Sequence, residues 1–158
     1  MASTISSADL KIKITEEIIL NGKDQGSSNT VTIGSINEVS SRIITISSGS
    51  FTTLFNITDS SSGSAGSFLS SSLKYARVTN KDDANMVLLR ISGSNTTDFR
   101  LEPGRSFILT DTRISGSDTG STTTTIDVEG YTGSLNINSI SAEPSGSAVD
   151  IEYFIANT

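Results

Sequence analysis

The stretch VDIEYFIA, residues 149–156, carries a large apolar side chain at every second position from Val149 to Ile155. In an extended strand, side chains at positions i and i+2 share a face, so these four side chains point the same way. They are β-branched or aromatic, as a pleated and half-buried strand favours. We therefore predict a strand that covers a hydrophobic core with Val149, Ile151, Tyr153 and Ile155.

The same alternation recurs along most of the chain, and Gly, Ser, Asn and Pro separate the runs. About ten short strands are expected, and only ITEEIIL (14–20) could form a helical turn. Many short strands without intervening helices indicate an all-β fold, here an antiparallel β-sandwich of jelly-roll type. Residues 1–8 are polar and are expected to form a flexible N-terminal arm, followed by one sandwich domain over residues 9–158. Examples of the runs are RIITI (42–46), FTTLFNI (51–57) and MVLLRI (86–91).

Turn chemistry makes one connection specific. In LEPGRSF (101–107), Pro103 supplies a φ near −65° and Gly104 can take the positive φ that a type II turn needs. The segment therefore predicts a hairpin that joins DFRL (98–101) to SFIL (106–109). Asn21-Gly22 marks another loop.

The composition excludes several classes of function. The formal net charge is −6 and the pI about 4.5, which disfavours nucleic acid and anionic membranes as partners. The chain has no Cys and no His, so it lacks thiolate chemistry and the commonest general base and metal ligand. Its longest apolar run, Met86 to Leu89, is far too short to span a membrane, and the N-terminus lacks the pattern of a secretory signal. No cofactor is expected.

Paired carboxylates offer the only candidates for chemistry. NKDDAN (80–85) has the oxygen donors that calcium prefers, but not the alternating spacing of a calcium loop. The favoured interpretation is a bend between two strands, in which Asn80 and Asp82-Asp83 bond the local backbone. Asp127 and Glu129 would share a strand face, as a glycosidase pair could, yet such pairs are common on exposed strands. We therefore predict that the chain is not an enzyme and holds no metal.

The order of these segments also resembles a known family. LKIKITEEIILNGKDQGSSNTVTI (10–33), LKYARVTNKDDANMVLLRI (73–91) and LEPGRSFIL (101–109) are similar to small virion structural proteins of tailed bacteriophages, especially marine cyanobacterial ones. The resemblance implies a β-sandwich subunit that oligomerises, often as a trimer, on the head or tail of the particle.

The resemblance leads to a capsid decoration (cement) protein as the expected function. Such a protein would be made in the host cytoplasm, would reside in the virion, and would bind the major capsid protein or other virion proteins. A strand with apolar residues on both faces, such as MVLLRI, is either central in a sandwich or covered by another subunit. The alternative function is the receptor- or glycan-binding head of a tail fibre or another surface-binding module. The expected interface residues are Asp9, Leu10, Lys11, Ile12, Ile14, Met86 and Leu88.

Overall fold

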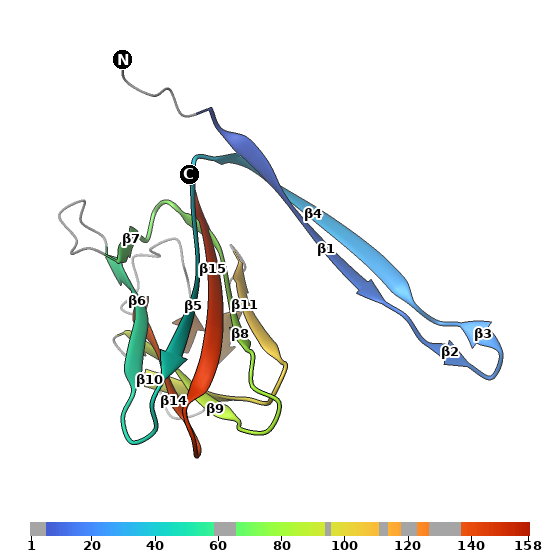
Figure 1. The fold of residues 1–158 in the computed structure, drawn as a ribbon. Helices are drawn as coiled ribbons and strands as arrows, with labels where there is room; N and C mark the ends of the chain where they lie inside the picture. Colours follow the sequence, from blue (N-terminus) through green and yellow to red (C-terminus); the bar gives the residue numbers. More distant parts are fainter. Residues whose placement is uncertain (1–5, 59–65, 94–95, 111–113, 118–122, 127–136) are drawn as a thin grey trace.

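The computed structural model describes residues 6–58, 66–93, 96–110, 114–117, 123–126 and 137–158. Figure 1 shows two parts, a β-sandwich and a long hairpin that projects from one end of it. No helix occurs in these ranges, and several antiparallel sheets are present, so the predicted all-β sandwich is confirmed. The segment 14–20, the one candidate for a helical turn, is extended over most of its length.

The projecting hairpin, residues 8–36, is called the arm from here on, and the name no longer refers to residues 1–8. It consists of two long strands and two short ones. β1 (Ala8–Glu16) pairs antiparallel with β4 (Ser27–Ile36). At the far end, β2 (Ile19–Leu20) pairs with β3 (Lys23–Asp24). Between these short strands, Asn21 and Gly22 have φ angles of 53° and 75°. Positive φ at both central residues is the requirement of the tight hairpin turn that Asn-Gly favours.

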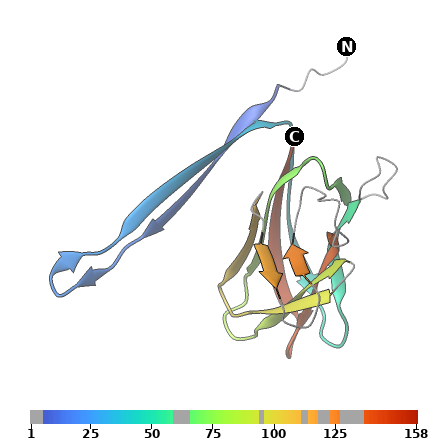
Figure 2. The same cartoon turned by 180° about the vertical axis from the view of Figure 1, so that it is seen from behind.

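Two sheets form the sandwich. The five-stranded sheet has the order β10 (Thr96–Leu101), β9 (Val87–Gly93), β14 (Ile137–Pro144), β6 (Thr52–Thr58) and β7 (Ser67–Leu69). The four-stranded sheet has the order β11 (Ser106–Thr110), β8 (Leu73–Asn80), β15 (Val149–Asn157) and β5 (Glu38–Ile46). A separate pair, β12 (Ile114–Ser117) and β13 (Thr123–Ile126), is seen best from behind (Figure 2).

The connectivity of the sandwich is that of a jelly roll. Apart from β7 and the β12–β13 pair, its strands form antiparallel pairs of β5 with β15, β6 with β14, β8 with β11 and β9 with β10. Successive pairs alternate between the two sheets. The pairing of β15 with β8 joins the two pairs of the four-stranded sheet, and the pairing of β14 with β9 joins the two pairs of the five-stranded sheet. This is a long hairpin rolled up on itself, which defines the fold and confirms its jelly-roll character.

The core lies between the two sheets. The alternate residues of β15 that the sequence assigns to an apolar face are all buried, as are Val87, Leu89 and Ile91 of β9. Phe55 of β6 packs near Tyr153 of β15, with ring centroids 5.6 Å apart. β9 lies inside the five-stranded sheet, between β10 and β14. Its apolar residues on both faces therefore agree with the first of the two explanations, a central position in the sandwich.

The predicted hairpin at LEPGRSF is wrong. The turn itself exists, because Gly104 has a φ of 68° and the Arg105 amide donates to the Glu102 carbonyl over 3.1 Å. However, β10 belongs to the five-stranded sheet and β11 to the four-stranded one, so the turn crosses between sheets. The preceding connection, from β8 to β9, crosses in the same way. Turn chemistry sets the local path of the chain and does not choose the partner of the strand that follows.

The N-terminal region also differs from the expected division at residue 8. The strands of the sandwich begin at Glu38, and residues 8–36 pair only within the arm. The alternating residues of β1 do not reveal this separation, because an amphipathic strand has the same sequence pattern whether or not its own domain covers it.

A matched pair of substitutions tests the inward and outward faces of the four-stranded sheet. Ile151→Ala removes a fully buried side chain of β15 and is expected to lower the free energy of unfolding by about 2–5 kcal/mol. Ile43→Ala changes a side chain of neighbouring β5 that is 65% exposed and should alter it by less than about 0.5 kcal/mol. Chemical denaturation measures both, and similar losses for the two variants would contradict the assigned faces.

Candidate functional site

The arm has one apolar and one polar face. In its register, Leu10 lies opposite Ile33 and Ile12 opposite Val31. Between these pairs, Lys11 lies opposite Thr32 on the other face. Since faces alternate along each strand, the apolar face runs along the length of the arm. It carries Leu10, Ile12, Ile14, Val31 and Ile33.

Only the base of the arm is covered by the sandwich. There Leu10, Ile12 and Ile33 pack against a small cluster on the outer face of the four-stranded sheet. Tyr75 and Phe154 form its aromatic floor, with ring centroids 6.0 Å apart. Burial raises the pKa of the Tyr75 hydroxyl, and the nearby Arg77 guanidinium acts in the opposite direction. The base is therefore a second, smaller core, completed by Ile36 and Ala156.

Beyond its base the arm extends away from the sandwich (Figures 1 and 2). Its aliphatic side chains are exposed there. Ile14 and Val31 are about half exposed. At the end of the arm, called the tip below (residues 17–24), Ile19 is 78% exposed, with Ile18 and Leu20 above half. A two-stranded hairpin is marginally stable at best in water, and three or more strands or a packed face are needed for independent stability. The outer part of the arm therefore has neither a third strand nor a packed face in the described part of the chain.

A wedge-shaped groove lies between the arm and the four-stranded sheet. Its deeper part, of about 490 Å³, is lined by aliphatic residues of both arm strands and by Ile108 of β11. An adjoining part, of about 430 Å³, shares Ile12, Ile14 and Ile108 and extends to the aromatic floor. We call both parts together the arm–sheet wedge. Its aliphatic lining is Ile12, Ile14, Val31, Ile33 and Ile108.

The two ends of the arm differ in charge. Lys11 and Lys13 line the arm–sheet wedge beside Arg77. Arg77 is already paired with Glu152 at 2.5 Å, whereas no ion pair joins either lysine to another residue in the described part of the chain. The tip instead gathers Glu17 and Asp24 around its isoleucines. The wedge is therefore apolar with a basic rim, and the tip is apolar with a mainly acidic one.

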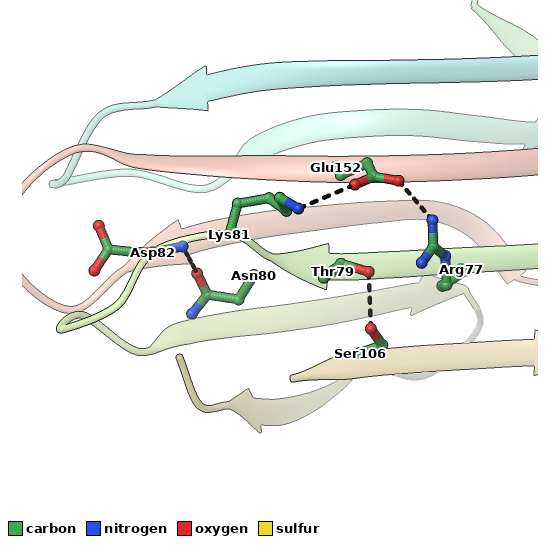
Figure 3. A network of polar contacts seen from close by, with 7 residues as sticks. All are labelled: Arg77, Thr79, Asn80, Lys81, Asp82, Ser106 and Glu152. Atoms are coloured by element: carbon green, nitrogen blue, oxygen red, sulfur yellow. Dashed lines mark hydrogen bonds and ion pairs between the residues drawn. The ribbon is translucent and has the colours of Figure 1, made fainter. Parts of the chain in front are cut away.

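Beside the wedge, the outer face of the four-stranded sheet is polar and internally satisfied (Figure 3). Glu152 accepts a hydrogen bond from Arg77 and lies 3.6 Å from the Lys81 ammonium. The hydroxyls of Thr79 and Ser106 are 2.8 Å apart across β8 and β11. These contacts link β8 to both of its neighbours, β15 and β11, across the outer face of the sheet.

The acidic bend is a hydrogen-bonded turn. The Asp82 carboxylate accepts the backbone amides of Asn85 and Ala84 at 2.5 and 2.8 Å. The buried Asn80 side chain accepts the Asp82 amide and donates to the carbonyls of Asn85 and Leu101. Hydrogen bonds from Asn85 first, and then from Ala84, hold the pKa of Asp82 below its ordinary value of 3.8. The Oδ1 atoms of Asn80 and Asp82, two of the oxygens that calcium could use, are thus engaged with the local backbone.

The predicted interface residues fall on two separate surfaces. Asp9 to Ile14 lie in β1 of the arm, where Leu10 and Ile12 reach the base and Ile14 is exposed. Met86 and Leu88 lie at the five-stranded sheet, and both are half-buried. Leu88 sits opposite Arg100 and Glu143 on the neighbouring strands. Sequence reasoning missed the tip and β4, although Asn21-Gly22 between two alternating runs is a strong hairpin signal.

The other candidate residues are either buried or outside the part of the chain that the structure describes. Asp127, Glu129 and the third tyrosine, Tyr131, lie outside the described residues. Tyr75 and Tyr153 are buried, so neither offers a stacking surface for a sugar. No group of three or more metal-binding side chains occurs within the described ranges.

The bend predicts a pH-dependent contribution to stability. Because the folded pKa of Asp82 is lowered, its ionised form stabilises the native state above the unfolded pKa, and this is lost as pH falls through the folded value. Asp82→Asn should therefore lower Tm at neutral pH, and its difference from the parent should shrink towards about pH 2. Circular dichroism melts across this range measure it, with Asp83→Asn at the same exposed bend as control. A difference that is constant with pH would contradict the assignment.

Comparison with known proteins adds no relative. No protein-family model, curated protein or solved structure matches the chain. The described ranges contain no helix with the length and apolar character that a membrane span requires. The arm, with its partly uncovered aliphatic face, is thus the feature from which function must be inferred.

Proposed function

We propose that the protein is a non-enzymatic structural subunit of a virion, and specifically a capsid decoration protein that binds and stabilises the assembled phage head. The observation that carries the proposal is the arm. Residues 8–36 contribute nothing to the core between the two sheets, yet they hold most of the strongly exposed large aliphatic side chains of the described chain. A chain that devotes this length to an unpartnered apolar element is suited to assembly.

The body of the protein suits the same role. The jelly roll is a two-sheet support with a continuous core, and polar side chains on its described strands pair with one another. The sequence resemblance to small virion structural proteins of tailed phages favours a virion as the assembly in which the protein takes part. The acidic net charge disfavours DNA as the partner and leaves a protein lattice.

The proposed protein would stabilise the head by thermodynamic linkage, because its binding favours the assembled lattice over the dissociated subunits. A subunit that binds the assembled lattice but not its dissociated parts stabilises it by RT ln(1 + [L]/Kd), about 2.7 kcal/mol per site at a hundredfold excess over Kd. Subunits joined to one another would bind several lattice sites at once and gain from the higher effective concentration. Decoration would therefore raise the temperature at which heads come apart without any catalytic step.

The proposal is tested on empty expanded heads of the cognate phage. Purified protein is expected to co-sediment with heads and to raise their disruption temperature in light-scattering melts. Ile19→Asp combined with Leu20→Asp should weaken head binding by at least about tenfold, because loss of the apolar tip removes either a direct contact with the lattice or the joining of subunits that bind several lattice sites at once. Ile43→Asp, an exposed aliphatic on the body, is the matched control and should bind normally.

Failure of the parent protein to bind heads at saturating concentration would overturn the virion role. Binding that survives the double substitution at the tip would instead show that the arm is not the assembly element. Calcium-dependent binding to a glycan array would favour a receptor-binding module.

A further inference from the structure

We propose that the tip of the arm docks into the arm–sheet wedge of a second copy of this chain. The tip is a segment of strongly exposed aliphatic side chains, and the wedge is a groove lined mainly by aliphatic ones. Both surfaces are open in the described part of the chain, and one is a projection whereas the other is a groove. The chain thus carries both halves of one interface.

Apolar matching is the first support. Ile18, Ile19 and Leu20 stand together at the turn of the hairpin, and all are more than half exposed. The wedge presents aliphatic side chains from both sides, from the arm and from β11. Its deeper part, about 490 Å³, falls in the ordinary range of about 300–1,000 Å³ for sites that enclose a ligand group.

Charge complementarity favours a second copy over an unrelated apolar segment. The tip places Glu17 and Asp24 beside its isoleucines, with Lys23 as the one cation. The rim of the wedge carries Lys11 and Lys13. These lysines stand out on a chain whose net charge is −6. Seating the tip would bring the carboxylates of one copy to the lysines of another, which directs the encounter more than it adds affinity.

Docking within one chain is excluded by the architecture. The tip and the wedge belong to the same hairpin, whose ladder runs without a break in pairing from Leu10–Ile33 to Glu16–Ser27. The arm would have to bend back on itself and lose these hydrogen bonds for the tip to reach its own wedge. Both views show it extended away from the sandwich (Figures 1 and 2).

The contact is heterologous, because the tip of one copy meets a different surface on the next. Heterologous contacts generate closed rings when the rotation between copies closes and open filaments when it does not. A ring would cover every tip and fill every wedge, so no aliphatic arm would remain exposed. It would also supply the outer arm with the packed face that an isolated two-stranded hairpin lacks.

Two substitutions separate the halves of the interface. Ile19→Asp places a carboxylate on the tip, and Ile108→Asp places one in the wedge; both side chains are already exposed, so the sandwich should remain folded. The parent protein is expected to be an oligomer in light scattering, and each variant a monomer of 16.6 kDa. Val31→Asp is a second wedge variant, and Ile43→Asp on the body is the matched control that stays oligomeric.

Mixing the two variants is the decisive step. Ile19→Asp keeps an intact wedge and Ile108→Asp an intact tip, so an equimolar mixture should form a dimer of twice 16.6 kDa and no larger species. A symmetric contact between like surfaces, or a groove made for another protein, would give no such recovery. Failure to recover the dimer would therefore overturn the proposal, provided that circular dichroism shows both variants folded.

A parent protein that stays monomeric at about 100 μM would overturn the proposal as well. The proposed virion role rests on the same arm, but self-association and head binding are measured separately. A parent protein that forms the oligomer without binding heads would contradict the proposed virion role alone. A monomeric parent that binds heads through its arm would contradict only the docking of the tip into the wedge.

Discussion

The structure depends on the pairing of β15 on both of its edges. This last strand lies between β5, the first strand of the sandwich, and β8, so it closes the four-stranded sheet with partners distant in sequence. Its inward side chains meet the opposite sheet, where Tyr153 packs against Phe55. Its outward Phe154 and Ala156 form part of the base of the arm. The strand that fills the core therefore also sets where the arm leaves the body.

A second constraint acts at one end of the roll, where the chain crosses twice between the sheets. The buried Asn80 side-chain amide donates to the carbonyl of Asn85, in the first crossing, and to that of Leu101, at the end of β10 where the second begins. Its backbone groups bond Arg105 and Gly104 in the second crossing. One side chain thus secures two bends that local turn chemistry alone would leave free to form hairpins. Buried polar groups need partners, and a fully satisfied network of this kind specifies a single arrangement of strands.

The sequence predicted the elements that depend on period and local chemistry. The faces of VDIEYFIA, the all-β sandwich, the Pro103-Gly104 turn and the bend at Asp82 follow from alternation and turn residues. The strands that pair with β10 and β11 could not be predicted from these local signals, because sheet pairing is set by long-range burial and by groups such as Asn80. The uncovered arm escaped prediction for a related reason. Leu10, Ile12 and Ile14 alternate as core residues do, and nothing local distinguishes a face covered by its own domain from one left for a partner.

The separation of the arm from the sandwich has a consequence for how such a chain can change over evolutionary time. Substitutions at Ile18, Ile19 or Leu20 leave the core between the sheets untouched, so selection for folding places little restriction on them. Core positions such as Ile140 and Ile151 are held fixed by packing, whatever the chain binds. The body can thus be conserved as a scaffold while the tip changes more quickly. Divergence between related chains is expected to concentrate in residues 17–24, which the packing of the core does not constrain.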